Sequence, residues 1–138
     1  MEVPLSQSVS RVRGVAVRFI APIGDTVFAA FADGLMYEKG AGLVECTDSA
    51  GASVVATGYC DTDSGTFFVS DTSVYRLVQL ADASSGGAYR LQKLNSHDMA
   101  GLKCVQYDVL DGMLYVGGSN GFIARGRCAQ QSTSVQFT

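Results

Sequence analysis

Apolar and polar residues alternate along most of this chain, which is the period-two pattern of a β-strand with one buried face. The alternating apolar positions include Val15, Val17 and Phe19, and again Val105, Tyr107 and Val109. Short runs of β-branched and aromatic residues at 66–69 and 113–116 also favour strands. No stretch of about a dozen residues carries the apolar stripe of an amphipathic helix. The pattern therefore predicts an all-β fold.

Turn-forming residues separate these segments at short, regular intervals. They include Gly24-Asp25, Asp33-Gly34, Gly40, Asp61–Gly65, Gly86-Gly87, Asp111-Gly112, Asn120-Gly121 and Gly126. Asn-Gly and Asp-Gly pairs favour the tight turns of β-hairpins, because both residues tolerate positive φ angles. Many short antiparallel strands are therefore expected.

The chain also repeats its own pattern, and repeats decide architecture. Residues 17–37 superimpose without a gap on 104–124, and a weaker copy occupies 56–76. Each copy has the order strand, hairpin turn, strand, tight turn, strand. A candidate fourth strand follows each copy, at 43–47, 88–94 and 133–137. The repeat predicts three four-stranded antiparallel blades at 15–47, 54–95 and 102–138 within a single domain, with 1–14 as an N-terminal arm or outer strand.

The third copy resembles a blade of a WD40-type β-propeller. The features that carry the resemblance are, in order, Ser96-His97, Leu102, Val105, Tyr107, Asp111-Gly112, Gly117–Gly121 and Phe122–Ala124. In that family a Gly-His pair precedes the inner strand and a Trp-Asp pair ends the third strand. Here Ser96 replaces the glycine, Arg125-Gly126 stand near the Trp-Asp position, and the chain has no tryptophan. The resemblance implies a partial β-propeller without the family's usual hydrogen-bonded tetrad.

Three blades are too few to close a ring, since known propellers use about four to eight. Open end blades would expose apolar faces, which monomers seldom tolerate. We therefore expect a second copy, forming a six-bladed ring, or another polypeptide to complete the propeller. The alternative fold is a β-sandwich, which would suit a structural or decoration component of a viral particle.

Composition and net charge argue against some classes of function. The net charge of −3 gives no electrostatic reason to expect nucleic acid as the main partner, and no apolar run is long enough to span a membrane. The four cysteines form no C-x-x-C pair and lack histidines at zinc spacing, which favours reduced thiols in an intracellular protein. A cytoplasmic location is the first interpretation, and an organelle is the alternative.

Two motifs suggest chemistry that their context does not support. Residues 117–121 match the G-x-S-x-G nucleophile elbow, but a strand pattern follows them and the single histidine precedes the serine. Residues 61–66 begin like a calcium loop but lack its glycine and its distant glutamate. Both are interpreted as turns. We therefore predict no enzymatic activity, no cofactor, no metal site and no small-molecule substrate.

The propeller interpretation gathers polar turn residues on one face. These residues are Asp33, Asp48, Asp71, His97, Asp98 and Asn120, with Phe31, Tyr59 and Tyr107 as possible neighbours. Such an acidic rim would receive a basic segment of a partner protein, with a few anchor residues supplying most of the affinity. The sequence therefore predicts a non-catalytic protein–protein interaction or scaffold subunit of a larger assembly.

Overall fold

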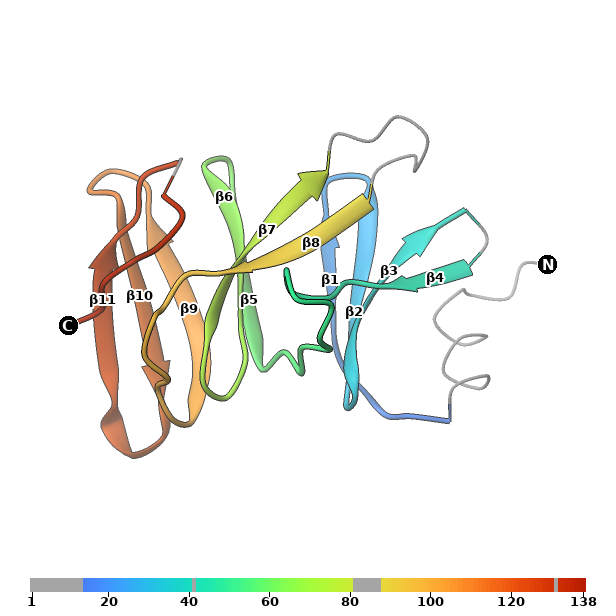
Figure 1. Cartoon of the computed structure of the whole chain (residues 1–138), viewed down its shortest axis with the longest axis horizontal. Helices are drawn as coiled ribbons and strands as arrows, with labels where there is room; N and C mark the ends of the chain where they lie inside the picture. The colour runs from blue at the N-terminus through green and yellow to red at the C-terminus, as the bar shows by residue number, and fades with distance from the viewer. Residues whose placement is uncertain (1–13, 41, 81–87, 131) are drawn as a thin grey trace.

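The chain folds into three antiparallel β-sheets that lie side by side in sequence order (Figure 1). The computed structural model describes residues 14–40, 42–80, 88–130 and 132–138. No α-helix occurs in this described part, so the prediction of an all-β fold is confirmed. The predicted N-terminal arm, apart from Gly14, and the Gly86-Gly87 turn lie outside the described residues. None of the described segments is a helix of the length and apolarity that a membrane crossing requires.

The first sheet is a four-stranded meander. Its strands are β1 (Val17–Ile23), β2 (Thr26–Phe31), β3 (Gly34–Lys39) and β4 (Gly42–Glu45), in that order across the sheet. Gly24-Asp25 makes the first reversal, as its turn chemistry predicts. The second reversal is at Ala32-Asp33, one residue before the predicted Asp33-Gly34, because Gly34 already belongs to β3.

The middle sheet repeats this arrangement. Its strands are β5 (Gly58–Thr62), β6 (Gly65–Val69), β7 (Val74–Leu80) and β8 (Ala88–Lys93). The β5–β6 turn is the segment that begins like a calcium loop. Its oxygens serve the turn itself, because Thr66 Oγ1 donates to Asp61 Oδ1 at 2.6 Å and Thr62 Oγ1 donates to the Gly65 carbonyl at 2.8 Å.

The third sheet has three strands instead of the predicted four. They are β9 (Leu102–Asp108), β10 (Met113–Gly118) and β11 (Ile123–Arg127), and the 3₁₀ turn η2 (Ser119–Gly121) joins the last two. The G-x-S-x-G motif therefore forms a turn between two strands, and its Asn120 has a positive φ of 61°. This context lacks the helix that a nucleophile elbow requires.

The expected fourth strand at 133–137 departs from the sheet because the segment bridges two sheets. Arg125 and Thr138 exchange both backbone hydrogen bonds, at 3.2 and 2.9 Å, which is the start of a pairing with β11. The Val135 N–H instead donates to the Leu94 carbonyl at the end of the middle sheet. Gly126 permits this crossing, because a Cβ there would collide with Val135 and with the Gln136 carbonyl. The predicted turn at Gly126 is therefore wrong: the residue lies within β11, and its missing side chain serves close packing.

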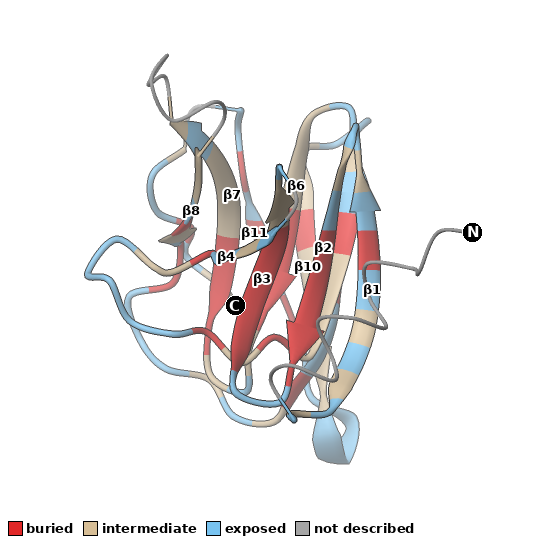
Figure 2. Ribbon diagram, turned by 90° about the vertical axis from the view of Figure 1, so that its right-hand side faces the viewer, coloured by how far each residue is buried: buried red, intermediate tan, exposed pale blue. Residues whose placement is uncertain are grey.

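Two apolar cores lie between the three sheets. Between the first and middle sheets, Phe28 packs on Phe68 with ring centroids 5.9 Å apart, and Phe19 stacks on Tyr59 at 5.6 Å. Most of the buried residues lie within the strands, and most exposed residues lie in the turns (Figure 2). Each fully buried aromatic ring contributes roughly 1.5–3 kcal/mol of hydrophobic stabilisation.

The second core lies between the middle and third sheets. Phe67 packs on Tyr107 at 5.3 Å, and Leu114 and Val116 of β10 are fully or almost fully buried against the middle sheet. Gly58 allows β5 and β9 to approach closely, since a Cβ there would lie 2.6 Å from the Lys103 carbonyl oxygen. The middle sheet is therefore covered on both faces.

Candidate partner-binding site

Four chain reversals gather at one end of the molecule, the lower end in Figure 1: the β2–β3, β6–β7 and β10–β11 turns and the β8–β9 loop. Backbone hydrogen bonds tie three of them together. The Leu102 N–H donates to the Asp71 carbonyl at 3.0 Å, and the Ser119 N–H donates to the Gly101 carbonyl at 2.9 Å. We call the exposed polar residues Asp33, Asp71, His97, Asp98 and Asn120 at this end the lower rim.

The buried side chain of Asn95 forms hydrogen bonds with three segments beneath the lower rim. This buried side chain accepts the Val74 N–H at 2.9 Å and donates to the carbonyls of Thr72 and His97 at 3.2 and 2.9 Å. One amide thus joins the start of β7, the β6–β7 turn and the β8–β9 loop. The backbone beneath Asp71 and His97 is therefore fixed before a partner binds.

Asp48 differs from the other predicted site residues, because its carboxylate serves its own loop. Asp48 Oδ1 accepts the N–H groups of Ala50 and Ala52 at 2.9 and 2.8 Å, and the residue forms a parallel bridge with Leu91. This is the local capping that aspartate often makes in turns. Asp48 is therefore placed beside β8 and is not grouped with the lower rim.

Asp98 makes an ion pair with Lys93 at the edge of the rim. Its Oδ1 lies 3.2 Å from the Lys93 Nζ, and both side chains are largely exposed. Exposed pairs of this kind are worth little, so a competing cation from a partner displaces Lys93 at small cost. The carboxylate is therefore available for binding.

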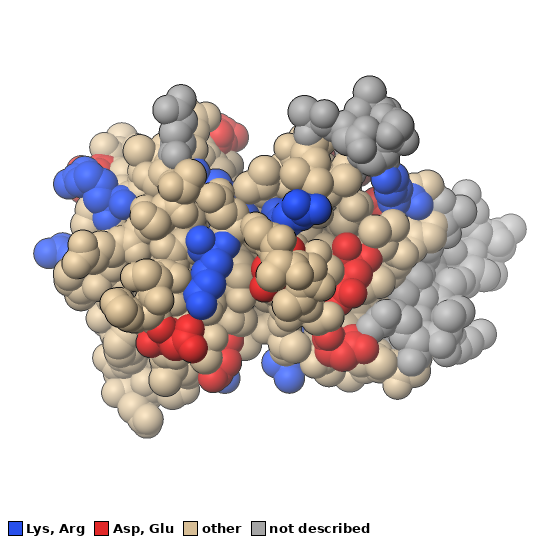
Figure 3. All heavy atoms as spheres, in the orientation of Figure 1, with Lys and Arg blue, Asp and Glu red and all other residues tan. Residues whose placement is uncertain are grey.

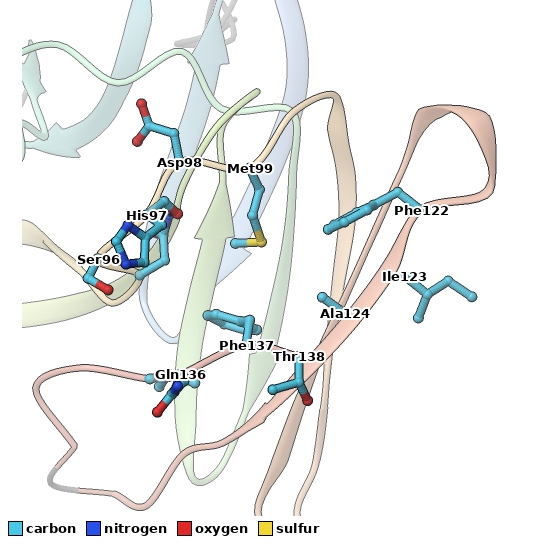
Figure 4. A pocket seen from close by; sticks show the side chains of 12 residues that line it. Ser96, His97, Asp98, Met99, Phe122, Ile123, Ala124, Gln136, Phe137 and Thr138 are labelled. Carbon is cyan, nitrogen blue, oxygen red and sulfur yellow. Dashed lines mark hydrogen bonds between the residues drawn. The ribbon is translucent and has the colours of Figure 1, made fainter.

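A groove of about 270 Å³ runs beside the β8–β9 loop, between β11 and the C-terminal segment (Figure 4). Met99 and Phe137 point into it, and Phe122 lines one side. His97 and Asp98 stand at its polar edge. The groove thus has an apolar floor with His97 and Asp98 along one edge, and the Asp98 carboxylate points away from Met99 and Phe137 (Figure 4).

A second hollow, of about 460 Å³, lies around Asp71 and has mixed charge. Arg18 and Lys103 line it together with Asp71 and the hydroxyl groups of neighbouring serine and threonine residues. Figure 3 shows acidic side chains mainly on the lower half of the face in view and basic side chains mainly above them. The acidic character predicted for the rim is therefore interrupted by two cations near Asp71.

The aromatic neighbours suggested for the rim are buried or packed against other rings. Phe31 is 1% exposed, and Tyr59 is sandwiched between Phe19 and Phe68. Tyr107 packs on Phe67 and donates its hydroxyl to the Cys128 carbonyl at 2.7 Å. Tyr59 and Tyr107 lie on inner faces of their sheets, whereas Phe31 is buried with Ala29 and Met36 on the other face of the first sheet. None of the three is a rim residue.

Sequence reasoning missed Arg76, which binds the chain just after β11, ahead of the C-terminal residues that line the groove. Its guanidinium donates to the carbonyls of Ala129, Gln130 and Ser132 at 2.6–3.0 Å and to Cys128 Sγ at 3.0 Å. The same group lies 5.5 Å from the centre of the Phe67 ring. The only sequence signal was a charged residue within an apolar strand run, which does not reveal its distant partners.

The three buried thiols have raised pKa values, which lowers their reactivity. Burial raises the pKa of Cys46 to about 12 and that of Cys60 to about 11, and it also raises the pKa of Cys128. Cys104, by contrast, is exposed on β9. Among the described residues no group of three or more histidine, cysteine or acidic side chains is arranged to hold a metal ion.

Comparison of the chain with known proteins finds no matching family model, no matching curated protein and no matching solved structure. The resemblance of the third repeat to a WD40 blade thus stays a prediction. What this chain binds is inferred from the rim and the groove themselves.

Proposed function

We propose that this chain is a non-catalytic interaction subunit of propeller type, and that its groove and lower rim bind an extended segment of a partner protein. The observation that carries the proposal is an apolar groove floor, Met99 and Phe137, that shares its lining with the polar residue Asp98. A side chain of the partner buried in the groove would supply most of the affinity. The carboxylate of Asp98 would favour a basic residue next to that side chain in the partner.

The preferred segment has one large apolar residue next to a basic residue. The groove volume of about 270 Å³ suits a single leucine-sized or aromatic side chain. A lysine or arginine beside it would reach Asp98 and displace the exposed Lys93 contact. Asp71, held by its backbone bond to Leu102, offers a second carboxylate farther along the rim.

The platform for such binding is rigid, which favours recognition. The Asn95 bonds fix the β6–β7 turn and the β8–β9 loop, and the Arg76 bonds hold the chain that leads from β11 to the C-terminal wall of the groove. A preformed surface loses less conformational entropy when a ligand binds. Rigid turns at one end of consecutive sheets are the usual docking surface of propellers.

Peptide selection tests this function directly. A random peptide library displayed on phage would be selected on the purified chain, and the enriched peptides measured by fluorescence polarisation. We expect enriched peptides with an apolar residue beside lysine or arginine, and affinity about tenfold weaker or more for Asp71→Lys with Asp98→Lys. The matched control is Asp25→Lys with Asp63→Lys, which changes the net charge equally in exposed turns away from the rim.

Two results would overturn the proposed function. One is the absence of any enriched peptide. The other is enrichment that the rim reversal and the control reversal affect equally, since that would reflect net charge alone.

A further inference from the structure

The two ends of the stack of sheets differ in how well their outer faces are covered (Figure 1). The outer face of the first sheet is largely filled by its own chain, since Phe31 and Met36 are 1% and 8% exposed in a core cluster against which Val17 packs. On the third sheet, Ile123 of β11 is 75% exposed, and its side chain points away from the groove (Figure 4). The open end of the stack is therefore the outer face of the third sheet.

Strand alternation fixes which residues lie on this open face. Leu114 and Val116 of β10 belong to the second core, so Met113, Tyr115 and Gly117 face the opposite side. Strand register places one residue of β9 and one of β11 beside each of these three, in three rows across the face. In the same order, the flanking pairs are Asp108 with Arg127, Gln106 with Arg125, and Cys104 with Ile123.

The two edges of this face carry complementary chemistry. Along β9 the face presents a carboxylate, an amide and a thiol, and along β11 it presents two guanidinium groups and an apolar side chain. A guanidinium donates to carboxylate and amide oxygens, and a thiol packs well on an aliphatic group. Within one copy, β10 holds these two edges about 10 Å apart, and Arg127 donates instead to the Asp111 carbonyl at 3.0 Å. The face is therefore complementary to a second copy of itself.

Charge selects one orientation for such a second copy. A twofold axis parallel to β10 lays β11 of each copy over β9 of the other and keeps the three rows in register. Arg127 then faces Asp108 of the other copy, and β10 lies over β10. A twofold axis perpendicular to β10 would instead lay β11 over β11 and oppose Arg125 to itself. Because opposed like charges disfavour association, the first orientation is the complementary one. It also keeps the strands nearly aligned, as packed sheets usually are.

We propose that two copies of this chain form a dimer in which their third sheets pack face to face about a twofold axis parallel to β10. Each contact then occurs twice, and association stops at two copies because the outer face of the first sheet is largely filled. The dimer is a stack of six sheets in place of the ring expected from the blade count. The groove opens on the other side of Ile123, so the dimer goes beyond the proposed peptide binding and does not depend on it (Figure 4).

The size of the contact sets the expected affinity. β10 has six residues, so a face of three such strands measures about 14 by 20 Å. A patch of this size lies at the small end of specific protein interfaces. We therefore expect a reversible dimer with a dissociation constant in the micromolar range or above.

Charge reversal in the first row tests the pairing. Arg127→Glu alone opposes two carboxylates at both copies of the contact, and Asp108→Lys alone opposes two cations there. Each variant should therefore dissociate at least about tenfold more readily than the unmodified dimer. In an equal mixture of the two variants, both contacts of a heterodimer join opposite charges. The mixture should therefore associate as strongly as the unmodified chain.

The measurement is the molar mass by light scattering from about 1 µM to 1 mM, a range that spans the expected dissociation constant. The unmodified chain should approach twice 14.5 kDa at the higher concentrations. Arg90→Glu and Asp25→Lys are the matched controls, because they make the same changes of net charge at exposed positions of β8 and the β1–β2 turn. Both controls should dimerise as the unmodified chain does.

A second pair of variants guards against a folding defect. Asp108 Oδ1 accepts the Leu110 N–H at 3.0 Å within its own turn, so Asp108→Lys also weakens that turn. Gln106→Lys and Arg125→Glu repeat the test at exposed strand positions of the middle row. Gln106→Lys alone opposes Arg125 of the other copy and should weaken the dimer. An equal amount of Arg125→Glu should restore it.

Disulfide formation tests the register of the two sheets. Ile123→Cys places a second thiol opposite Cys104 of the other copy, and disulfides do join facing strands of packed sheets. Within one copy the two positions lie about 10 Å apart across β10, which is beyond the reach of a disulfide. Oxidation should therefore give a covalent dimer whose linked peptides contain residues 104 and 123. Adding Cys104→Ser should abolish it, and Ile20→Cys on the first sheet should give no such dimer.

Any of four results would overturn the dimer: a monomer at every concentration, a dimer that the reversals weaken no more than the controls do, mixtures that fail to restore association in both rows, or a covalent dimer that lacks the 104–123 linkage. A monomer that still selects rim-dependent peptides leaves the proposed binding role intact. A dimer that selects no peptide overturns that role alone.

Discussion

The side-chain oxygen of Asn95 accepts the backbone N–H of Val74 at 2.9 Å, so that a loop residue fixes the first position of a strand in the middle sheet. The amide nitrogen of the same residue donates to two carbonyls of the rim. Loss of this amide leaves a buried N–H without its acceptor, which is among the costlier defects in a protein interior.

Asn95→Ala should therefore lower the free energy of unfolding by about 1–3 kcal/mol in urea denaturation. Asn95→Asp keeps the acceptor for Val74 but replaces both donated bonds with contacts between oxygen atoms, so it should also destabilise the fold. Wild-type stability in Asn95→Ala would mean that the rim does not depend on this side chain.

The contacts of Arg76 predict a local effect at the C-terminal segment. Arg76→Gln removes charged bonds to three carbonyls, so the segment after β11 should open more often. Trypsin cleavage after Arg127 should become about tenfold faster, which corresponds to a loss of about 1.4 kcal/mol of local stability. Arg90→Gln is the matched control, because Arg90 is exposed on β8 and holds no part of this segment. Equal cleavage rates in the two variants would show that the Arg76 bonds do not hold the segment after β11.

The sequence predicted the strands and turns well because both depend on local pattern. The repeat also aligned Phe28 with Phe67, and each ring packs on the following sheet. Arg76 and Asn95 escaped prediction because the partners of Arg76 lie 52–56 residues away in the chain, and two of the three partners of Asn95 lie 21 and 23 residues away. The missing fourth strand of the third sheet has the same origin, since Val135 bonds to Leu94 of another sheet. Contacts of this kind are set by tertiary packing and leave no local signature.

Close backbone approach makes Gly126 sensitive to the smallest substitution. A Cβ at this position would meet Val135 and the backbone of Gln136, so the crossing segment would have to move. Gly126→Ala should lower the free energy of unfolding by about 1–3 kcal/mol. Gly42→Ala is the control, because its Cβ would meet no atom within 4 Å, and its effect should stay within about 0.5 kcal/mol. Thermal unfolding of both variants, followed by circular dichroism, provides the comparison. Similar midpoint temperatures would show that the crossing segment can move without a loss of stability.

The buried thiols predict how stability depends on alkaline pH. Burial raises the pKa of Cys46 from 9.0 to about 12, so between these values the unfolded chain loses a proton that the folded chain keeps. Below about pH 9 both states hold the proton and the thiol has no effect. Above it, the free energy of unfolding should fall by up to about 1.4 kcal/mol per pH unit for this thiol. Cys60, with a pKa near 11, adds a similar loss over a narrower range.

Urea unfolding between pH 8 and 11 measures this dependence, and Cys46→Ala isolates the contribution of one thiol from ionising tyrosines and lysines. The variant should be less stable than the wild type at pH 8, because it loses a buried sulfur, yet its stability should fall less steeply above pH 9. The two curves should therefore converge as the pH rises. Parallel curves would show that the Cys46 thiol ionises equally in the folded and unfolded chains, and that the first core admits water at this position.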